Sequence, residues 1–172
     1  MPRICLTKDE IRELASLLSE VFEHITALRS DNPLAEKIQF PKIPAILSES
    51  IIIHLLKEHR IVPNINAQGI SFGGREADIV VETSSGEALK IEVKATGSSA
   101  FEYFGEKDIA SDYLVWIHFG SFFMNAGERF IDIFIIRDPS QYFSGPVKIT
   151  LRKFRELIGT NVQQLRLNID EL

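Results

Sequence analysis

The sequence lacks several features that would place the protein in a special class. It has one cysteine, Cys5, which cannot form a disulfide within the chain, and a reducing compartment is therefore expected. It has no apolar run near the roughly 20 residues that a membrane-spanning helix needs, and its first residues have no signal-peptide core. We therefore expect a cytoplasmic protein with no membrane partner.

The sequence also lacks a basic excess, with 19 Lys and Arg against 24 Asp and Glu and a formal net charge of −5. A passive nucleic-acid coat protein would normally carry such an excess, so the balance argues against that class. It does not exclude an enzyme that acts on nucleic acid, because carboxylates around a divalent metal would themselves make the total negative. With 45% hydrophobic residues and no repeat or Gly/Ser linker, we expect a single domain over 1–172.

A long N-terminal helix is expected over about residues 8–29. Thr7 and Glu10 form a T-x-x-E capping box at its start. Apolar residues then recur at alternating steps of three and four, which is typical of a heptad-like stripe. They are Ile11, Leu14, Leu18, Val21, Ile25 and Leu28. This stripe either packs against the rest of the chain or forms a helix-to-helix dimer contact.

The remaining pattern predicts an α/β fold with a mixed central β-sheet flanked by helices. Pro41 and Pro44 open a second helix that runs to about His59. Gly159 ends a last helix within a C-terminal helical region of about 150–172. Between these helices we expect strands near 70–72, 78–81, 88–95, 113–119 and 130–136, and a short helix over 102–112.

A predicted hairpin brings charged residues together on one face of the sheet. Ser84-Ser85-Gly86 suits a three-residue hairpin loop, and this register places Thr83 opposite Glu87, Val80 opposite Lys90 and Asp78 opposite Glu92. Since side chains alternate along a strand, one face carries Glu76, Asp78, Lys90, Glu92 and Lys94. Opposed carboxylates repel each other, and a divalent cation such as Mg²⁺ would remove that conflict.

Glu49 is a further candidate carboxylate on the second predicted helix. It lies in line with Ile46, Ile53 and Leu56, so the charge sits within the apolar stripe. A buried carboxylate usually has a hydrogen-bond partner or a metal ion. The sequence leaves open whether Glu49 serves the metal site, extends its carboxylate to solvent or pairs with an arginine.

These residues, in this order, resemble the PD-(D/E)xK nuclease superfamily. The resemblance is carried by Asp78, by Glu92-Val93-Lys94 after thirteen intervening residues, and by the upstream helical Glu49. It covers a core of about 45–120 and implies a restriction-endonuclease-like fold, with a helix, three strands, a helix and a strand. The implied activity is Mg²⁺-dependent hydrolysis of double-stranded DNA, most like that of a compact type II restriction endonuclease.

The resemblance also implies roles for individual residues. Asp78 and Glu92 would hold one or two Mg²⁺ ions, for which Mn²⁺ would substitute, and Glu49 would hold a second ion or its water. Lys94 would orient the attacking water or neutralise the phosphate charge. The segment after Lys94 resembles the turn that follows the catalytic strand in several restriction endonucleases. Its candidate DNA contacts are Thr96, Gly97, Ser98 and Ser99. The implied partners are duplex DNA, a second copy in a homodimer, and a cognate DNA methyltransferase encoded nearby.

Departures from the superfamily pattern keep other functions open. Ala77 replaces the proline of the motif, and the Q-x-x-x-Y element of exonuclease-like members is missing. The segment that follows the motif has instead Glu102, Glu106, Lys107 and Asp108. A repair or recombination nuclease such as a junction resolvase is one alternative, and a catalytically silent DNA-binding or assembly module is another. The histidine spacing does not predict zinc, and His118 is expected to be a hydrogen-bonded core residue.

Overall fold

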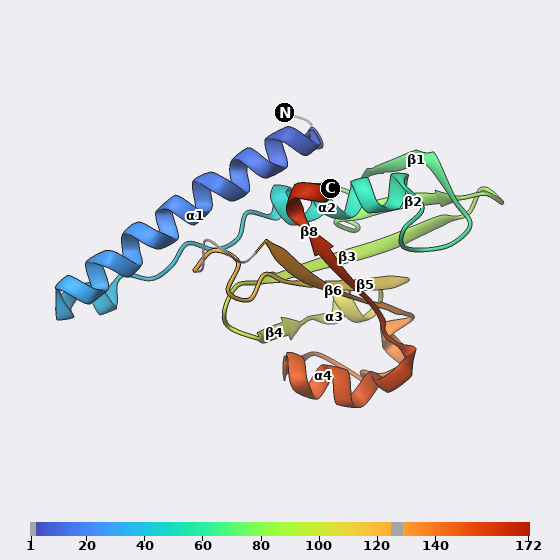
Figure 1. The fold of residues 1–172 in the computed structure, drawn as a ribbon. Coiled ribbons are helices and arrows are strands. Elements are labelled where there is room, and N and C mark those ends of the chain that lie inside the picture. The colour runs from blue at the N-terminus through green and yellow to red at the C-terminus, as the bar shows by residue number, and fades with distance from the viewer. Residues whose placement is uncertain (1–2, 125–128) are drawn as a thin grey trace.

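A six-stranded mixed sheet forms the centre of the fold (Figure 1) in the computed structural model, which describes residues 3–124 and 129–172. The strand order is β1-β2-β3-β5-β6-β8. Strands β3 and β5 are parallel, and the other neighbouring strands are antiparallel. These strands are β1 (Ile65–Phe72), β2 (Ile79–Thr83), β3 (Ala88–Thr96), β5 (Tyr113–His118), β6 (Phe130–Arg137) and β8 (Gln163–Asn168). A separate two-stranded sheet pairs β4 (Phe101–Phe104) with β7 (Val147–Thr150).

Helices cover both faces of the large sheet, so the expected α/β class with a mixed, helix-flanked sheet is confirmed. One hydrophobic core joins the sheet to α1 (Lys8–Asp31) and α2 (Ala45–Lys57). On the opposite face, a second core includes side chains of α3 (Glu106–Ile109), α4 (Leu151–Ile158) and the β4/β7 pair. Short 3₁₀ helices occur at Pro33–Lys37, Pro139–Gln141, Gly159–Asn161 and Ile169–Glu171. None of the helices in the described part of the chain combines the length and apolar character needed to cross a bilayer.

The expected N-terminal helix is present as α1, and its apolar stripe is divided between two environments. The capping box forms, with the Glu10 backbone N–H donating to Thr7 Oγ1. The buried residues of the helix are Ile11, Ala15, Leu18 and Phe22. By contrast, Leu17, Val21 and Leu28 are exposed. Figure 1 shows the C-terminal half of α1 extending away from the sheet. The stripe therefore packs on the core along one edge and leaves an apolar edge uncovered.

The second helix is buried on nearly all sides. It begins at Ala45, with Pro44 as its N-cap, and ends at Lys57, slightly inside the limits that the sequence predicts. Residues on every side of it are buried, as expected for a helix that is apolar all round. Glu49 is therefore buried on a helix that has almost no solvent-exposed face.

The predicted hairpin has the expected register. Val80 pairs with Lys90, and the Thr83 N–H donates to the carbonyl of Glu87. Gly86 has φ +89°, the left-handed conformation that the three-residue loop requires. On the opposite face Ile79, Val81 and Ile91 are fully buried in the core, so the charged residues of this hairpin share the other face.

Two sequence predictions about local structure are wrong. Residues 102–112 form the end of β4 and the short α3 rather than one helix, because β4 pairs with β7, which lies far away in sequence. The region 150–172 is not wholly helical, since β8 pairs along β6 at the edge of the sheet. In both places a long-range partner decides between strand and helix, and local sequence does not show that partner.

The attachment of α1 to the body can be tested at Phe22. This ring stacks on Phe40 and Phe123, with ring centroids 4.8 and 5.0 Å away. Phe22→Ala should lower the free energy of unfolding by about 3 kcal/mol in chemical denaturation, because it removes a buried ring and leaves a cavity. The control Glu23→Ala, at an exposed position, should change it by less than about 0.5 kcal/mol. Equal small effects would mean that α1 is not docked as described.

Candidate functional site

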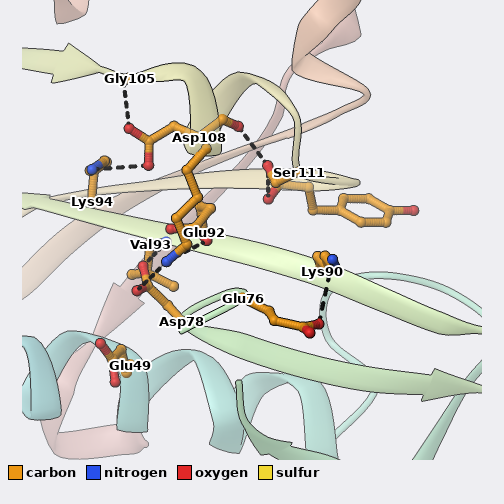
Figure 2. A network of polar contacts seen from close by, with 12 residues as sticks. Glu49, Glu76, Asp78, Lys90, Glu92, Val93, Lys94, Gly105, Asp108 and Ser111 are labelled. Carbon is orange, nitrogen blue, oxygen red and sulfur yellow. Dashed lines mark hydrogen bonds and ion pairs between the residues drawn. The ribbon is translucent and has the colours of Figure 1, made fainter. Parts of the chain in front are cut away.

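The central feature of the site is a pair of carboxylates at the open end of the β2/β3 hairpin (Figure 2). Asp78 immediately precedes β2, and its Oδ2 accepts a hydrogen bond from the Val93 N–H at 2.9 Å. Glu92 lies in β3, where it is only 3% exposed, beside the fully buried Leu114 of β5. The hairpin thus fixes Asp78 by a backbone contact and places Glu92 in an apolar setting.

A lysine from α3 lies between these two carboxylates. The Lys107 ammonium nitrogen is 3.1 Å from Glu92 Oε1 and 3.9 Å from Asp78 Oδ1. The first contact is an ion pair by distance, but Glu92 Oε1 accepts no well-aligned hydrogen bond from the described residues. Lys107 therefore gives this buried carboxylate oxygen a charged partner but no well-aligned hydrogen bond.

The surroundings of Glu92 change its protonation. Burial is the main reason that the pKa of Glu92 rises from 4.5 to about 7, and the charge of Asp78 raises it further. The Lys107 ammonium opposes this rise. Burial lowers the pKa of Lys107, but the Glu92 and Asp78 carboxylates outweigh burial and leave its pKa raised. Close to neutral pH the Glu92 carboxyl therefore occurs in both its protonated and its charged form.

Lys94 is on the same face but contacts a different carboxylate. Its ammonium nitrogen lies 3.0 Å from Oδ1 of Asp108, which is 5% exposed. The other oxygen of Asp108 accepts a hydrogen bond from the Gly105 N–H at 2.7 Å. Asp108 is thereby fixed at the start of α3, and it holds the Lys94 ammonium in a defined place.

Glu49 reaches the neighbourhood of Asp78 from α2 (Figure 2). It is 3% exposed, and Arg3 forms a two-point contact with it, at 3.0 Å to Oε1 and 2.8 Å to Oε2. The arginine pairing that the sequence left open is therefore present. Burial raises the pKa of Glu49, the Arg3 guanidinium lowers it, and the charge of Asp78 raises it, so Glu49 and Asp78 sense each other electrostatically.

Lys90 lies on the same face of the hairpin as Glu92 and Lys94, but in a different environment. Lys90 lies one pleat away from Glu92 and pairs with Glu76 at 3.5 Å. The Glu76 side chain is 74% exposed, so this pair lies in solvent. Lys90 and Glu76 share the face but not the buried centre.

The proposed DNA-contact segment is divided. Thr96 is buried, and its hydroxyl oxygen accepts from Trp116 Nε1 at 2.9 Å and lies 2.9 Å from His118 Nδ1. The Thr96 hydroxyl is thus engaged by the neighbouring strand, although the residue also lines the groove described below, and its contact with DNA stays a prediction. The same contact makes His118 the hydrogen-bonded histidine that was expected, and burial lowers its pKa.

The rest of that segment borders an open groove. Gly97, Ser98 and Ser99 line a cavity of about 540 Å³ at the C-terminal end of β3. Phe101 and the segment 40–43 form other parts of its wall. Ser98 and Ser99 are exposed and remain available to an incoming phosphate.

Comparisons with protein-family models, curated proteins and solved structures give no significant match. The geometry of the site itself is therefore the evidence for its chemistry. Within residues 3–124 and 129–172, no three His, Cys, Asp or Glu side chains are grouped so that they could together hold a metal ion. Asp78 and Glu92 form a two-carboxylate site instead. Two carboxylates fit Mg²⁺, which commonly keeps water molecules and takes further oxygens from substrate phosphates.

Sequence reasoning missed three contributors to this site. They are Arg3, Lys107 and Asp108. Lys107 and Asp108 lie in the segment that replaces the missing Q-x-x-x-Y element. Their charges were the sequence feature that could have indicated a place in the site. Arg3 lies far from Glu49 in sequence, so its identity as a partner depends on tertiary structure.

The raised pKa of Glu92 implies a pH-dependent stability. Between pH 4.5 and 7 the folded protein binds more protons at this carboxyl than the unfolded chain, so stability falls as pH rises through this window. A pKa of about 7 instead of 4.5 corresponds to a loss of about 3 kcal/mol. In metal-free chemical denaturation at pH 5 and pH 8, Glu92→Gln should lack this part of the pH dependence. The same pH dependence in both proteins would contradict the assignment.

Proposed function

We propose that the protein is a Mg²⁺-dependent endonuclease that hydrolyses phosphodiester bonds of double-stranded DNA. The observation that carries the proposal is the buried Glu92 carboxylate opposite Asp78, with the single Lys107 ammonium beside both. The α2-β1-β2-β3-β4-α3-β5 succession, in which β4 lies outside the large sheet and β3 and β5 are parallel, supports a restriction-endonuclease-like core. A site-specific type II restriction endonuclease is the form that this reading favours.

Within this proposal Asp78 and Glu92 would hold the metal ion. A bound divalent cation would lower the pKa of a water molecule and so supply the nucleophile. Lys94 would carry positive charge to the scissile phosphate, and Asp108 would fix the position of its ammonium through the 3.0 Å contact. Glu49 would orient water from the α2 side, with Arg3 holding its carboxylate. Gly97, Ser98 and Ser99 would guide the DNA backbone along the groove.

A second candidate is a catalytically silent DNA-binding or assembly module. It is favoured by the Lys107 ammonium between the two carboxylates and by the Arg3 contact that occupies both oxygens of Glu49. In this reading the charged residues stabilise the fold and no metal enters. Absence of cleavage by the wild type with Mg²⁺ or Mn²⁺ would support it.

Cleavage assays on supercoiled plasmid and on branched oligonucleotides test the proposal. Wild-type protein should cut in Mg²⁺ and stop on addition of EDTA. Asp78→Asn should lower the cleavage rate on the order of 100-fold or more, since even outer-shell partners of a metal contribute about 10- to 100-fold. Cutting of duplex at a defined sequence would favour restriction, whereas cutting confined to branched DNA would favour a junction resolvase.

The matched control for this assay is Glu76→Gln. Glu76 is a carboxylate on the same face, but its side chain is 74% exposed and pairs with Lys90 outside the buried centre. This variant should cleave within about threefold of wild type, because an exposed pair contributes little. Cleavage that continues in EDTA, or equal losses in the two variants, would contradict a metal site at Asp78.

Cutting both strands of a duplex is most simply done by a two-fold homodimer. The uncovered edge of α1, formed by Leu17, Val21 and Leu28, is the candidate interface. Sedimentation should give about twice the mass of one 19.5 kDa chain. Leu17→Lys should yield folded monomers, because the added charge would lie in the apolar contact. Ser16→Lys adds the same charge at an exposed position outside that edge and should leave the dimer intact. A monomeric wild type would contradict this model.

A further inference from the structure

The ammonium group of Lys107 lies between the Asp78 and Glu92 carboxylates, where a metal ion would bind. Its ammonium nitrogen lies within 4 Å of one oxygen from each carboxylate, 3.1 Å from Glu92 and 3.9 Å from Asp78. Lys94, the lysine of the sequence motif, pairs with Asp108 instead. A positive charge thus already occupies the space between the two carboxylates, and it comes from a residue outside the motif.

This ammonium and a divalent cation compete for the same space. A cation that binds both oxygens would lie in the region where the ammonium now lies, and two positive charges at such a distance repel strongly in a partly buried setting. Glu92 is 3% exposed, so water cannot screen this repulsion well. The two cations therefore cannot share this position between the carboxylates.

The Lys107 ammonium is the cation that can move away from the carboxylate pair. Its side chain is 46% exposed, so the ammonium can move into solvent. Its neighbour Asp108 stays fixed by Gly105 and Lys94, which keeps the short helix α3 in place while the lysine moves.

We propose that Lys107 is a displaceable internal cation that neutralises the Asp78 and Glu92 pair in the metal-free protein and gives way to a divalent metal ion. This inference deepens the proposed function and depends on it. The lysine lowers the apparent metal affinity, so the site fills only when the metal concentration is high enough to displace it. Once released, the ammonium lies at the mouth of the site, where a substrate phosphate would arrive.

Metal binding measured without DNA tests this proposal. Mn²⁺ affinity is measured by calorimetry at pH 8.5, above the pKa of Glu92, for wild type, Lys107→Met and the control Lys90→Met. Methionine keeps the unbranched shape of lysine and removes its charge. Lys107→Met should bind Mn²⁺ about tenfold more tightly than wild type, a difference of about 1.4 kcal/mol. Lys90→Met should stay within about threefold, because Lys90 pairs with the exposed Glu76.

Thermal melting gives a second readout on the same proteins. Without metal, Lys107→Met should melt at a lower temperature than wild type, because the two carboxylates lose their counter-charge. Its rise in melting temperature on adding Mn²⁺ should exceed that of wild type. Lys107→Gln should behave in the same way if Lys107→Met does not fold.

Failures of the two proposals can be told apart. If wild type binds Mn²⁺ and the Lys107 variants bind it with equal or lower affinity, the displaceable cation is wrong and the metal site stands. If neither wild type nor the variants bind Mn²⁺, both the displaceable cation and the metal-dependent function are overturned.

Discussion

The repulsion between two carboxylates at the open end of the β2/β3 hairpin is the constraint around which the site is arranged. Glu92 is buried beside Leu114, and Asp78 is held by the Val93 N–H, so the hairpin keeps the two groups close to each other. A pair of this kind needs a positive charge or a shared proton. The structure supplies the charge with Lys107, whose ammonium nitrogen lies 3.1 Å from Glu92 Oε1. The same requirement is what makes the pair a candidate for a divalent cation.

Elements from both faces of the sheet support this centre. From one face, α2 brings Glu49, which Arg3 holds by both oxygens. From the other face, pairing of β4 with β7 sets where α3 begins, and α3 carries Lys107 and Asp108. Asp108 in turn holds Lys94. Changes far from the carboxylates, such as a weakened β4/β7 pair, would therefore disturb the lysines first.

Sequence reasoning reached those parts of the fold that depend on local chemistry. The Thr7 capping box, the hairpin register around Gly86 and the end of the last helix at Gly159 follow from nearby residues, and the structure confirms them. Helical spacing placed Glu49 among apolar residues but left open whether its carboxylate reaches solvent, and the structure buries it. The roles of Lys107 and Arg3, and the strand at 163–168, depend on contacts between distant segments. The local sequence pattern does not predict such contacts.

The most direct test of the account is the location of a bound metal ion in the folded protein. Nuclear magnetic resonance with traces of Mn²⁺ reports this location, because the ion broadens the amide signals of nearby residues. We expect the signals of residues 77–79 and 92–94 to broaden first, while those of the acidic C-terminal turn at Ile169–Glu171 remain sharp. Broadening first at that turn, or no selective broadening at any residue, would contradict a metal site formed by Asp78 and Glu92.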